Sequence, residues 1–170
     1  NAVAMTTSIE ASFGARIVAA GFVLNNQLTD FAFVPEVAGR PVKNRPDAGK
    51  RPRSSMAPTL VFDEGGRLVL AVGSPGGARI IAYVAQTLIG VLDWRLDIQA
   101  AIELPHVVNR NGPTELETAS SAEALRQALE RRGHSVQIRD LTSGLHGIQH
   151  NGAVLMGGAD PRREGAVRAD

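Results

Sequence analysis

Hydroxyl and carboxyl side chains recur at every second residue close to the N-terminus. Thr6, Ser8 and Glu10 have this spacing, and residues 1–9 are rich in Val, Met, Thr and Ile, which is typical of a β-strand. Side chains alternate between the two faces of a strand, so the three polar groups would share one face. Two hydroxyls and a carboxylate on one face would form a polar wall that could bind a ligand. Taken alone, these residues also fit the ordinary polarity of a strand or turn.

A glycine-rich turn, Gly73-Ser-Pro-Gly-Gly77, lies between a predicted strand and a predicted helix. It lacks the Lys-Ser/Thr ending of a phosphate-binding loop and the Gly-x-Gly-x-x-Gly pattern of dinucleotide-binding folds. Its backbone N–H groups, at the N-terminus of a helix, could instead stabilise developing negative charge as an oxyanion hole. The motif alone favours a purely structural turn, because glycines are common between strands and helices.

Two other clusters of polar residues are weaker candidates. The basic run between Lys43 and Arg53 contains no aromatic residue for base stacking and is interrupted by Asp47, so a solvated loop is the better interpretation. His146 and His150 could share one face of a strand, but no third metal ligand stands near them in the sequence. We therefore expect neither a metal ion nor a cofactor.

The composition narrows the class of protein. The chain has 170 residues, a formal net charge of +1 and no cysteine. A nucleic-acid binder usually carries a large basic excess, so nucleic acid is not an expected partner. No segment approaches the ~20 apolar residues that span a bilayer, and no basic region followed by an apolar run marks a signal peptide. The first residues are already strand-like, so the chain is expected to begin within an element.

Strands are predicted at both ends of the chain and helices in its centre. The irregular region 34–53, which holds four of the nine prolines, is predicted to be a long loop. Asp97 and Ser120 are the expected N-caps of the second and third helices. This order predicts an α+β fold with helices against an antiparallel sheet and without βαβ alternation. The predicted strands are 1–9, 15–24, 59–62, 68–72, 136–138, 147–149 and 153–156, and the predicted helices are 78–94, 97–104 and 120–132.

Taken together and in order, several segments resemble the γ-glutamyltransferase (glutathione hydrolase) family. They match the small, C-terminal subunit that forms when the precursor cleaves itself. Each piece is weak, but the set covers nearly the whole chain. The matching segments are residues 1–14, residues 21–31, Lys50-Arg-Pro-Arg-Ser-Ser-Met-Ala-Pro-Thr59, Gly73-Ser-Pro-Gly-Gly-Ala-Arg-Ile80 and Gly157-Gly-Ala-Asp-Pro-Arg162.

The resemblance implies an N-terminal-nucleophile hydrolase fold, an αββα sandwich. Residues 1–170 would be the small-subunit part of one such domain, completed by a large subunit from the same precursor, and loop 34–53 would be a lid. The implied activity moves a γ-glutamyl group from glutathione or a related amide to water, an amino acid or a peptide. It proceeds through an acyl-enzyme on an N-terminal threonine that precedes Asn1, and this threonine's α-amine acts as its base. A periplasmic or secreted location is expected from the bacterial family.

The resemblance also implies roles for single residues. Thr6 would lie beside the nucleophile and hydrogen-bond its hydroxyl, and Gly76 and Gly77 would form the oxyanion hole. Two features depart from the family pattern: Glu10 stands where Asn is frequent, and Ser8 stands where Thr is frequent. An arginine that binds the substrate carboxylate would come from the large subunit. The α-ammonium of the substrate would contact Ser8, Glu10, Gln27 and Asp30, and its α-carboxylate would contact Ser54 and Ser55.

Two alternatives remain beside γ-glutamyl transfer. The first is an acylase that acts on glutaryl amides such as cephalosporin side chains, within the same framework. An ammonium pocket argues against it, because a glutaryl group has no amine to face Asp30 and Glu10. The second is a non-catalytic subunit that lacks the nucleophile. The chain by itself is expected to be inactive, since Asn1 has no hydroxyl to attack an acyl carbon.

Overall fold

The structure is a computed structural model that describes residues 1–168. The chain divides into two compact units, and each is described by itself. The sheet unit comprises Asn1–Thr6 and the chain from Ser55 onward, and the loop unit comprises Thr7–Ser54.

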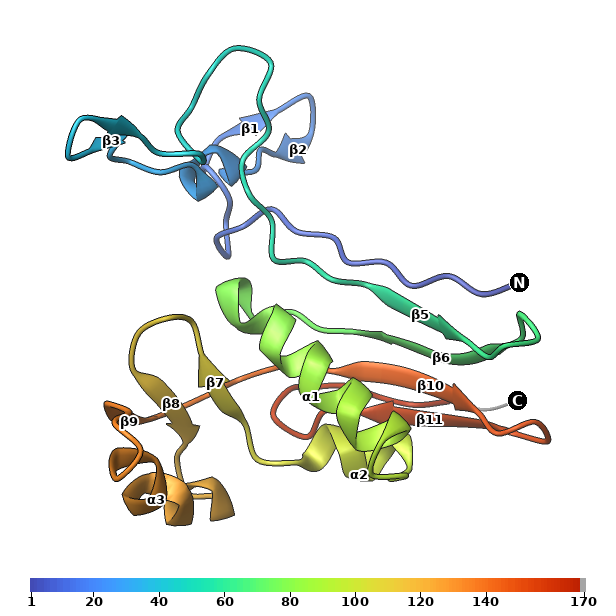
Figure 1. Cartoon of the computed structure of the whole chain (residues 1–170). Coiled ribbons are helices and arrows are strands. Elements are labelled where there is room, and N and C mark those ends of the chain that lie inside the picture. Colours follow the sequence, from blue (N-terminus) through green and yellow to red (C-terminus); the bar gives the residue numbers. More distant parts are fainter. Residues whose placement is uncertain (169–170) are drawn as a thin grey trace. The chain divides into compact units, whose positions relative to one another are not determined.

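A four-stranded antiparallel sheet is the centre of the sheet unit (Figure 1). The hairpin predicted around Gly65-Gly66 is confirmed, because Gly66 adopts a φ of 75° and turns β5 back onto β6. Strand β10 pairs with β6 on one side and with β11 on the other, which joins chain segments more than 70 residues apart. In spatial order the strands are β11 (Leu155–Ala159), β10 (His146–His150), β6 (Leu68–Gly73) and β5 (Thr59–Phe62).

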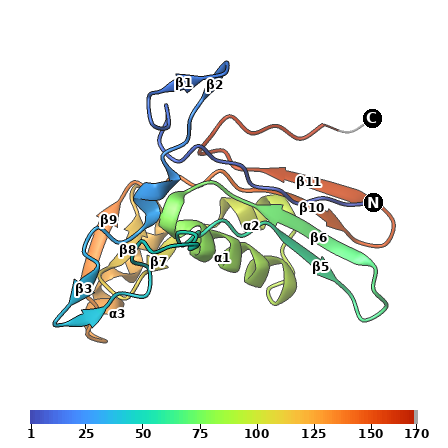
Figure 2. The same cartoon turned by 90° about the horizontal axis from the view of Figure 1, so that it is seen from above.

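Two helices lie on one side of this sheet (Figure 2). Helix α1 (Ile80–Leu92) follows a short 3₁₀ turn, η2 (Gly77–Arg79), and α2 (Ile98–Glu103) begins at Asp97, whose Oδ1 accepts a hydrogen bond from the N–H of Ala100 at 2.8 Å. The expected cap at Asp97 is therefore confirmed. The apolar core beneath them includes Leu70, Val72, Tyr83, Val84, Ile98, Ile102 and Leu145, all almost fully buried.

Two glycines allow α2 to approach the sheet closely. A Cβ atom at Gly147 of β10 would lie 2.6 Å from Cδ1 of Ile98, and one at Gly158 of β11 would lie 2.9 Å from Cδ1 of Ile102. Any side chain at these positions would push the helix away.

A second, three-stranded sheet was not predicted. It consists of β7 (Val107–Asn109), β8 (Thr114–Glu117) and β9 (Val136–Arg139). Strands β8 and β9 are parallel, and the connection between them holds η3 (Ser121–Leu125) and α3 (Arg126–Glu130). This single βαβ unit was not predicted, since no βαβ alternation was expected along the chain. Strand β9 and the N-cap at Ser120, whose Oγ accepts from the N–H of Ala122, were predicted.

The loop unit has little regular structure. The predicted strand 15–24 is instead a tight hairpin of β1 (Val18–Ala19) and β2 (Phe22–Val23), because Ala20 and Gly21 adopt φ angles of 50° and 81° and reverse the chain. A 3₁₀ turn, η1 (Gln27–Asp30), follows. The predicted loop 34–53 is irregular apart from a second small hairpin, β3 (Glu36–Val37) with β4 (Arg40–Pro41).

The α+β class is confirmed, but residues 1–9 form no strand. Apolar side chains remain exposed on the face of the four-stranded sheet opposite to α2: Ile148, one residue beyond the helix-facing Gly147, is 50% exposed. Among the residues that the structure describes, no helix is long and apolar enough to cross a membrane.

Candidate active site

One asparagine joins two polar segments of the loop unit. The side-chain N–H₂ of Asn26 donates to Oε2 of Glu10 at 2.5 Å and to Oγ1 of Thr29 at 3.2 Å. Its Oδ1 accepts from the N–H of Ala11 at 2.9 Å, and its own N–H donates to the carbonyl of Ile9 at 3.2 Å. Asn26 therefore fixes the segment around Glu10 against the start of η1.

The predicted pair Gln27 and Asp30 lies in the same turn. Nε2 of Gln27 donates to Oδ2 of Asp30 at 3.2 Å, which orients the amide so that its oxygen is left to accept other donors. That oxygen, Oε1, is buried and has no hydrogen-bond partner among the described residues. A buried acceptor without a donor is costly, so the position is suited to a ligand N–H.

Glu10 does not project from a strand, as was expected. Its φ of 73° is left-handed, a conformation that a non-glycine residue rarely adopts, and the Oγ of Ser8 accepts from its N–H at 2.8 Å. The prediction that Thr6, Ser8 and Glu10 share one strand face is therefore wrong. Ser8 and Glu10 are instead brought together by a turn.

The region after the second hairpin is tied to Asp30. Nδ2 of Asn44 donates to the carbonyl of Asp30 at 2.7 Å, and its Oδ1 accepts from the N–H of Arg53 at 2.9 Å. Ser54 is the last residue of the loop unit and Ser55 is the first of the next segment of the sheet unit. The predicted site residues are thus divided between the two units, with Ser8, Glu10, Gln27, Asp30 and Ser54 in the loop unit.

In the sheet unit, Thr6 lies beside the start of the glycine turn. A Cβ atom built on Gly73 would lie 3.6 Å from Oγ1 of Thr6. Gly76 has a φ of 139°, and a Cβ there would lie 2.7 Å from Cε2 of Tyr83, so only glycine fits. Gly77 has a φ of 58° but open space around it. At the end of the turn, Arg79 pairs with the buried Glu115 through two contacts of 2.6 and 2.8 Å.

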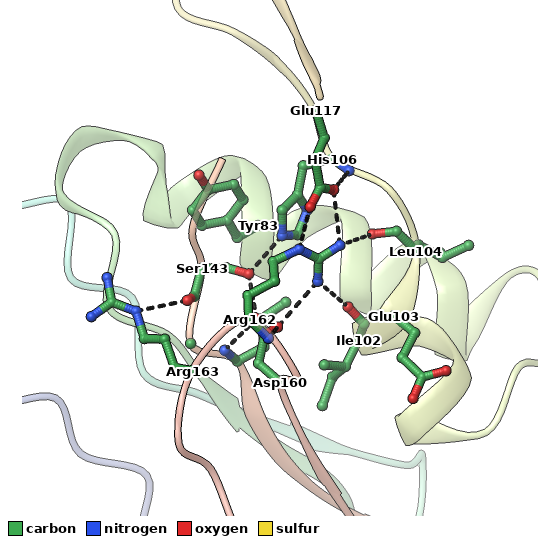
Figure 3. A network of polar contacts seen from close by, with 12 residues as sticks. Tyr83, Ile102, Glu103, Leu104, His106, Glu117, Ser143, Asp160, Arg162 and Arg163 are labelled. Carbon is green, nitrogen blue, oxygen red and sulfur yellow. Dashed lines mark hydrogen bonds and ion pairs between the residues drawn. The ribbon is translucent and has the colours of Figure 1, made fainter. Parts of the chain in front are cut away.

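A buried polar network lies at the end of β11 and was missed in the sequence (Figure 3). The guanidinium of Arg162 pairs with Glu117 at 2.5 Å and with Asp160 at 3.1 Å, and it donates to the carbonyls of Ile102 and Leu104. The Asp160-Pro-Arg162 motif was part of the family resemblance, but its partners are distant in the sequence. The network joins α2, β8 and the segment after β11.

Ser143 and His106 extend this network. The serine lies between the carboxylate and the imidazole, whereas in a catalytic triad the imidazole lies between the other two groups. The Ser143 hydroxyl donates to Oδ2 of Asp160, and Nε2 of His106 lies 2.6 Å from Oγ of Ser143. The serine is fully buried between the other two groups and donates to the carboxylate rather than to the imidazole. These residues are therefore structural.

Burial lowers the pKa of His106 to about 4, and the nearby Arg162 guanidinium contributes to the shift. Burial alone would raise the pKa of Glu117, but the hydrogen bonds from Arg162 and from the His106 N–H hold it below its usual range. Among the described residues, no group of three or more His, Cys, Asp or Glu side chains could hold a metal ion.

The comparisons with known proteins cover nearly the whole chain. The profile of the γ-glutamyltranspeptidase family matches residues 1–169. The glutathione hydrolase proenzyme of Escherichia coli is 37% identical over 172 residues, which are 95% of this chain and 29% of that protein. The acylase ACY 1 proenzyme of Pseudomonas sp. strain SE83 is also 37% identical, over 97% of this chain and 29% of that protein.

A crystal structure of a Helicobacter pylori γ-glutamyltranspeptidase variant superposes with a TM-score of 0.84 at 32% identity, over 96% of this chain and 94% of that one. The chain spans less than a third of the length of the curated relatives, which are proenzymes. The α+β architecture is accordingly that of the N-terminal-nucleophile hydrolases. The chain belongs to the γ-glutamyltranspeptidase family.

Proposed function

We propose that the full-length protein containing this chain transfers γ-glutamyl groups from glutathione and related amides to water, amino acids or peptides. The hydroxyl of a threonine that precedes Asn1 attacks the γ-carbonyl carbon, and its α-amine takes the proton and passes it to the departing amine nitrogen. Water or an acceptor amine then attacks the resulting ester and regenerates the threonine. Family membership over residues 1–169 supports this chemistry.

The acceptors of the loop unit carry the assignment of the substrate. A γ-glutamyl donor has a free α-ammonium, which brings three N–H donors and one positive charge. The unpartnered Oε1 of Gln27 supplies one acceptor, and the carboxylates of Asp30 and Glu10 supply two charged ones. Ser8, which accepts from the Glu10 N–H, completes the proposed ammonium site.

The remaining site residues are assigned by the same family pattern. Ser54 and Ser55 bind the substrate α-carboxylate, Thr6 hydrogen-bonds the nucleophile, and loop 34–53 acts as a lid. Gly76 and Gly77 direct backbone N–H groups at the oxyanion. These groups lie at the start of η2 and α1, where the first N–H groups of a helix have no acceptor within the helix.

A glutaryl acylase is the second candidate, because the Pseudomonas acylase matches as well as the E. coli enzyme does. The ammonium site distinguishes the two. A glutaryl group would leave the carboxylates of Glu10 and Asp30 without the positive charge of the ammonium, and the buried amide oxygen of Gln27 without a donor. Such sites reject analogues that lack the expected donor. We expect kcat/KM for a γ-glutamyl anilide to exceed that for the glutaryl anilide by about 100-fold or more.

Asp30→Ala tests the ammonium site. Loss of the charged partner should weaken γ-glutamyl binding by about 2–4 kcal/mol, which is roughly a 30- to 900-fold fall in kcat/KM. Glu10→Gln should cost less, since its amide oxygen still accepts a hydrogen bond. Asp63→Ala is the control: Asp63 lies in the β5–β6 hairpin, outside the proposed site, and pairs with Arg67. An Asp30→Ala enzyme within twofold of wild type, or a wild type that prefers the glutaryl anilide, would contradict the assignment.

The proposal includes a large subunit from the same precursor and action in the periplasm or outside the cell. The relatives' much greater length, set against the near-complete coverage of the H. pylori chain, supports a precursor that matures into two chains. Intact-mass measurement of the purified protein and fractionation of the native cells test these two parts separately.

A further inference from the structure

We propose that Asn26 is a positioning residue that holds the Glu10 carboxylate for the substrate ammonium. This inference rests on the proposed function, because it needs Glu10 to face the substrate. Asn26 itself is not assigned to substrate contact. Its role follows from the 2.5 Å hydrogen bond that its side-chain N–H₂ donates to Oε2 of Glu10.

Glu10 needs such a partner for two reasons. Its backbone is left-handed, with a φ of 73°, and a strained residue keeps such a conformation only when its surroundings hold it there. Its side chain is also exposed and long, so a free carboxylate would sample many positions. Asn26 restrains both the backbone and the side chain of Glu10. Its Oδ1 accepts from the N–H of Ala11, the next residue, and its Nδ2 donates to the Glu10 carboxylate.

The position of Asn26 also links the two carboxylates of the ammonium site. It directly precedes Gln27, whose amide holds Asp30. Thr29 closes the turn from the other side, since its Oγ1 donates to the Asn26 carbonyl at 2.8 Å and accepts from Nδ2. One short turn therefore fixes both acidic groups through successive amide side chains.

Asn26→Asp removes the hydrogen bond to Glu10, together with the longer 3.2 Å contact to Oγ1 of Thr29. The substituted side chain keeps an oxygen to accept from the Ala11 N–H, but it replaces the donor to Glu10 with a second negative charge. The carboxylate of Glu10 should turn away and lose its charge-assisted hydrogen bond to the substrate ammonium. We expect kcat/KM of the full-length enzyme for a γ-glutamyl anilide to fall by about 10- to 100-fold, the range for one hydrogen bond to a charged group. The fall should lie in KM, with kcat within about threefold.

Asn25→Asp is the matched control. It places the same charge one residue earlier, and the oxygen that accepts from the Gln27 N–H at 2.9 Å is retained. Asn25→Asp should change KM by less than about threefold. Equal effects of the two variants would overturn the proposal, since they would reflect added charge alone.

Combining Glu10→Gln with Asn26→Asp reverses the donor and the acceptor of the pair. The glutamine amide can donate to the introduced carboxylate, so the double variant should recover most of the KM lost in Asn26→Asp. A double variant no better than Asn26→Asp contradicts a positioning role. The side chain in Asn26→Ser is too short to reach Glu10 and adds no charge, so this variant should also raise KM. It replaces Asn26→Asp in the test if the Asn26→Asp precursor does not cleave itself into the active enzyme.

The outcomes separate this inference from the proposed function. A wild type without γ-glutamyl turnover, or one unaffected by Asp30→Ala, would contradict the function itself. An active wild type that depends on Asp30 but tolerates Asn26→Asp and Asn26→Ser would contradict only the role of Asn26.

Discussion

His106 couples the stability of the sheet unit to pH. Its imidazole is 1% exposed, and burial lowers its pKa to about 4, against about 6.5 for an unfolded histidine. Because Ser143 donates to Asp160, its oxygen accepts from the His106 Nε2–H, so the proton is on Nε2. Nδ1 is then unprotonated, and it is buried without a partner among the described residues. A second proton would place an unpaired charge in the core.

The sign of the pH effect follows from these values. Between pH 6.5 and 4 the unfolded chain takes up a proton on this histidine and the folded chain does not, so stability falls as the pH falls. Denaturant unfolding of the full-length protein should show a loss of up to about 3 kcal/mol across this window. His106→Gln should remove this slope, whereas His150→Gln, outside the network, should retain it. The pKa values of Glu117 and Asp160 are also lowered in the folded protein. Their carboxylates therefore reduce the free energy of unfolding only below about pH 4.5, where the unfolded chain takes up protons on these groups. A slope that is unchanged in His106→Gln would show that other groups cause it.

Gly77 allows the proposed oxyanion hole to be tested with little effect on packing in the glycine turn. Its φ is 58°, but a Cβ there would meet nothing within 4 Å, in contrast to the clash at Gly76. Gly77→Val carries the backbone strain of a β-branched residue at positive φ but meets no steric clash, so it should lose some stability and still fold. It should lower kcat much more than it raises KM, because an oxyanion contact strengthens in the transition state. Gly66→Val is the control, since Gly66 has a similar φ of 75° and equally open space in the β5–β6 hairpin. A rise in KM with kcat unchanged would return the turn to a structural role.

At the scale of elements, Arg162 joins α2, β8 and the segment after β11 through its hydrogen bonds and ion pairs. Its side chain is 15% exposed, and its partners Glu117 and Asp160 are more buried still. Removal of one partner of a buried ion pair leaves the other charges uncompensated, which costs about 3–5 kcal/mol. Arg162→Met should have this effect, and Arg162→Lys should be intermediate because an ammonium cannot reach two carboxylates and two carbonyls at once.

Hydrogen exchange measures this effect locally. In Arg162→Met, protection should fall together in peptides from α2, β8 and β11, while β5 should be less affected. Adding Glu117→Gln should recover part of the loss, since it removes one stranded charge. Unchanged exchange in β8 would show that the ion pair does not join these elements.

Elements with local signals could be predicted from the sequence, and those that depend on distant partners could not. The β5–β6 hairpin and α2 follow from Gly66 and Asp97, whose contacts lie within a few residues. Strand β8 was not predicted, because two of its four residues are acidic and the sequence does not look like a buried strand. Glu115 and Glu117 are buried only because Arg79 and Arg162 reach them from 36 and 45 residues away.

The candidate site shows the same limit. The family pattern indicated Glu10, Gln27 and Asp30, and the structure places them in one unit. Strand alternation gave the wrong local geometry, because Glu10 lies in a left-handed turn. Asn26 was missed because a polar residue beside a turn has no distinguishing sequence signal. The role proposed for it depends on the contact with Glu10, which is 16 residues away in the sequence.

At the scale of the whole molecule, much apolar surface is exposed. Four of the five phenylalanines are more than half exposed, and Phe33 reaches 84%. In the sheet unit, Phe62, Ile148 and Leu155 are at least half exposed on the four-stranded sheet and its edges. In an αββα sandwich the second sheet packs on the face of the first sheet that its helices leave open, which would bury apolar side chains such as Ile148. We therefore infer that further chain of the same protein covers it.

Ile148 and Ile81 offer a matched test of this inference. Both are isoleucines that are at least half exposed, but Ile148 lies on the open face of the sheet and Ile81 lies on α1, the helical layer that remains outermost in such a sandwich. In the full-length protein, Ile148→Lys should bury a charge against the second sheet and should reduce the yield of folded protein severely. Ile81→Lys should be tolerated, since its ammonium reaches solvent.

Residues 1–170 produced by themselves should aggregate or bind an apolar dye, and should not release anilide from a γ-glutamyl anilide. Equal tolerance of both variants in the full-length protein, together with a soluble and cooperatively melting 1–170 fragment, would show that the open face of the sheet needs no cover.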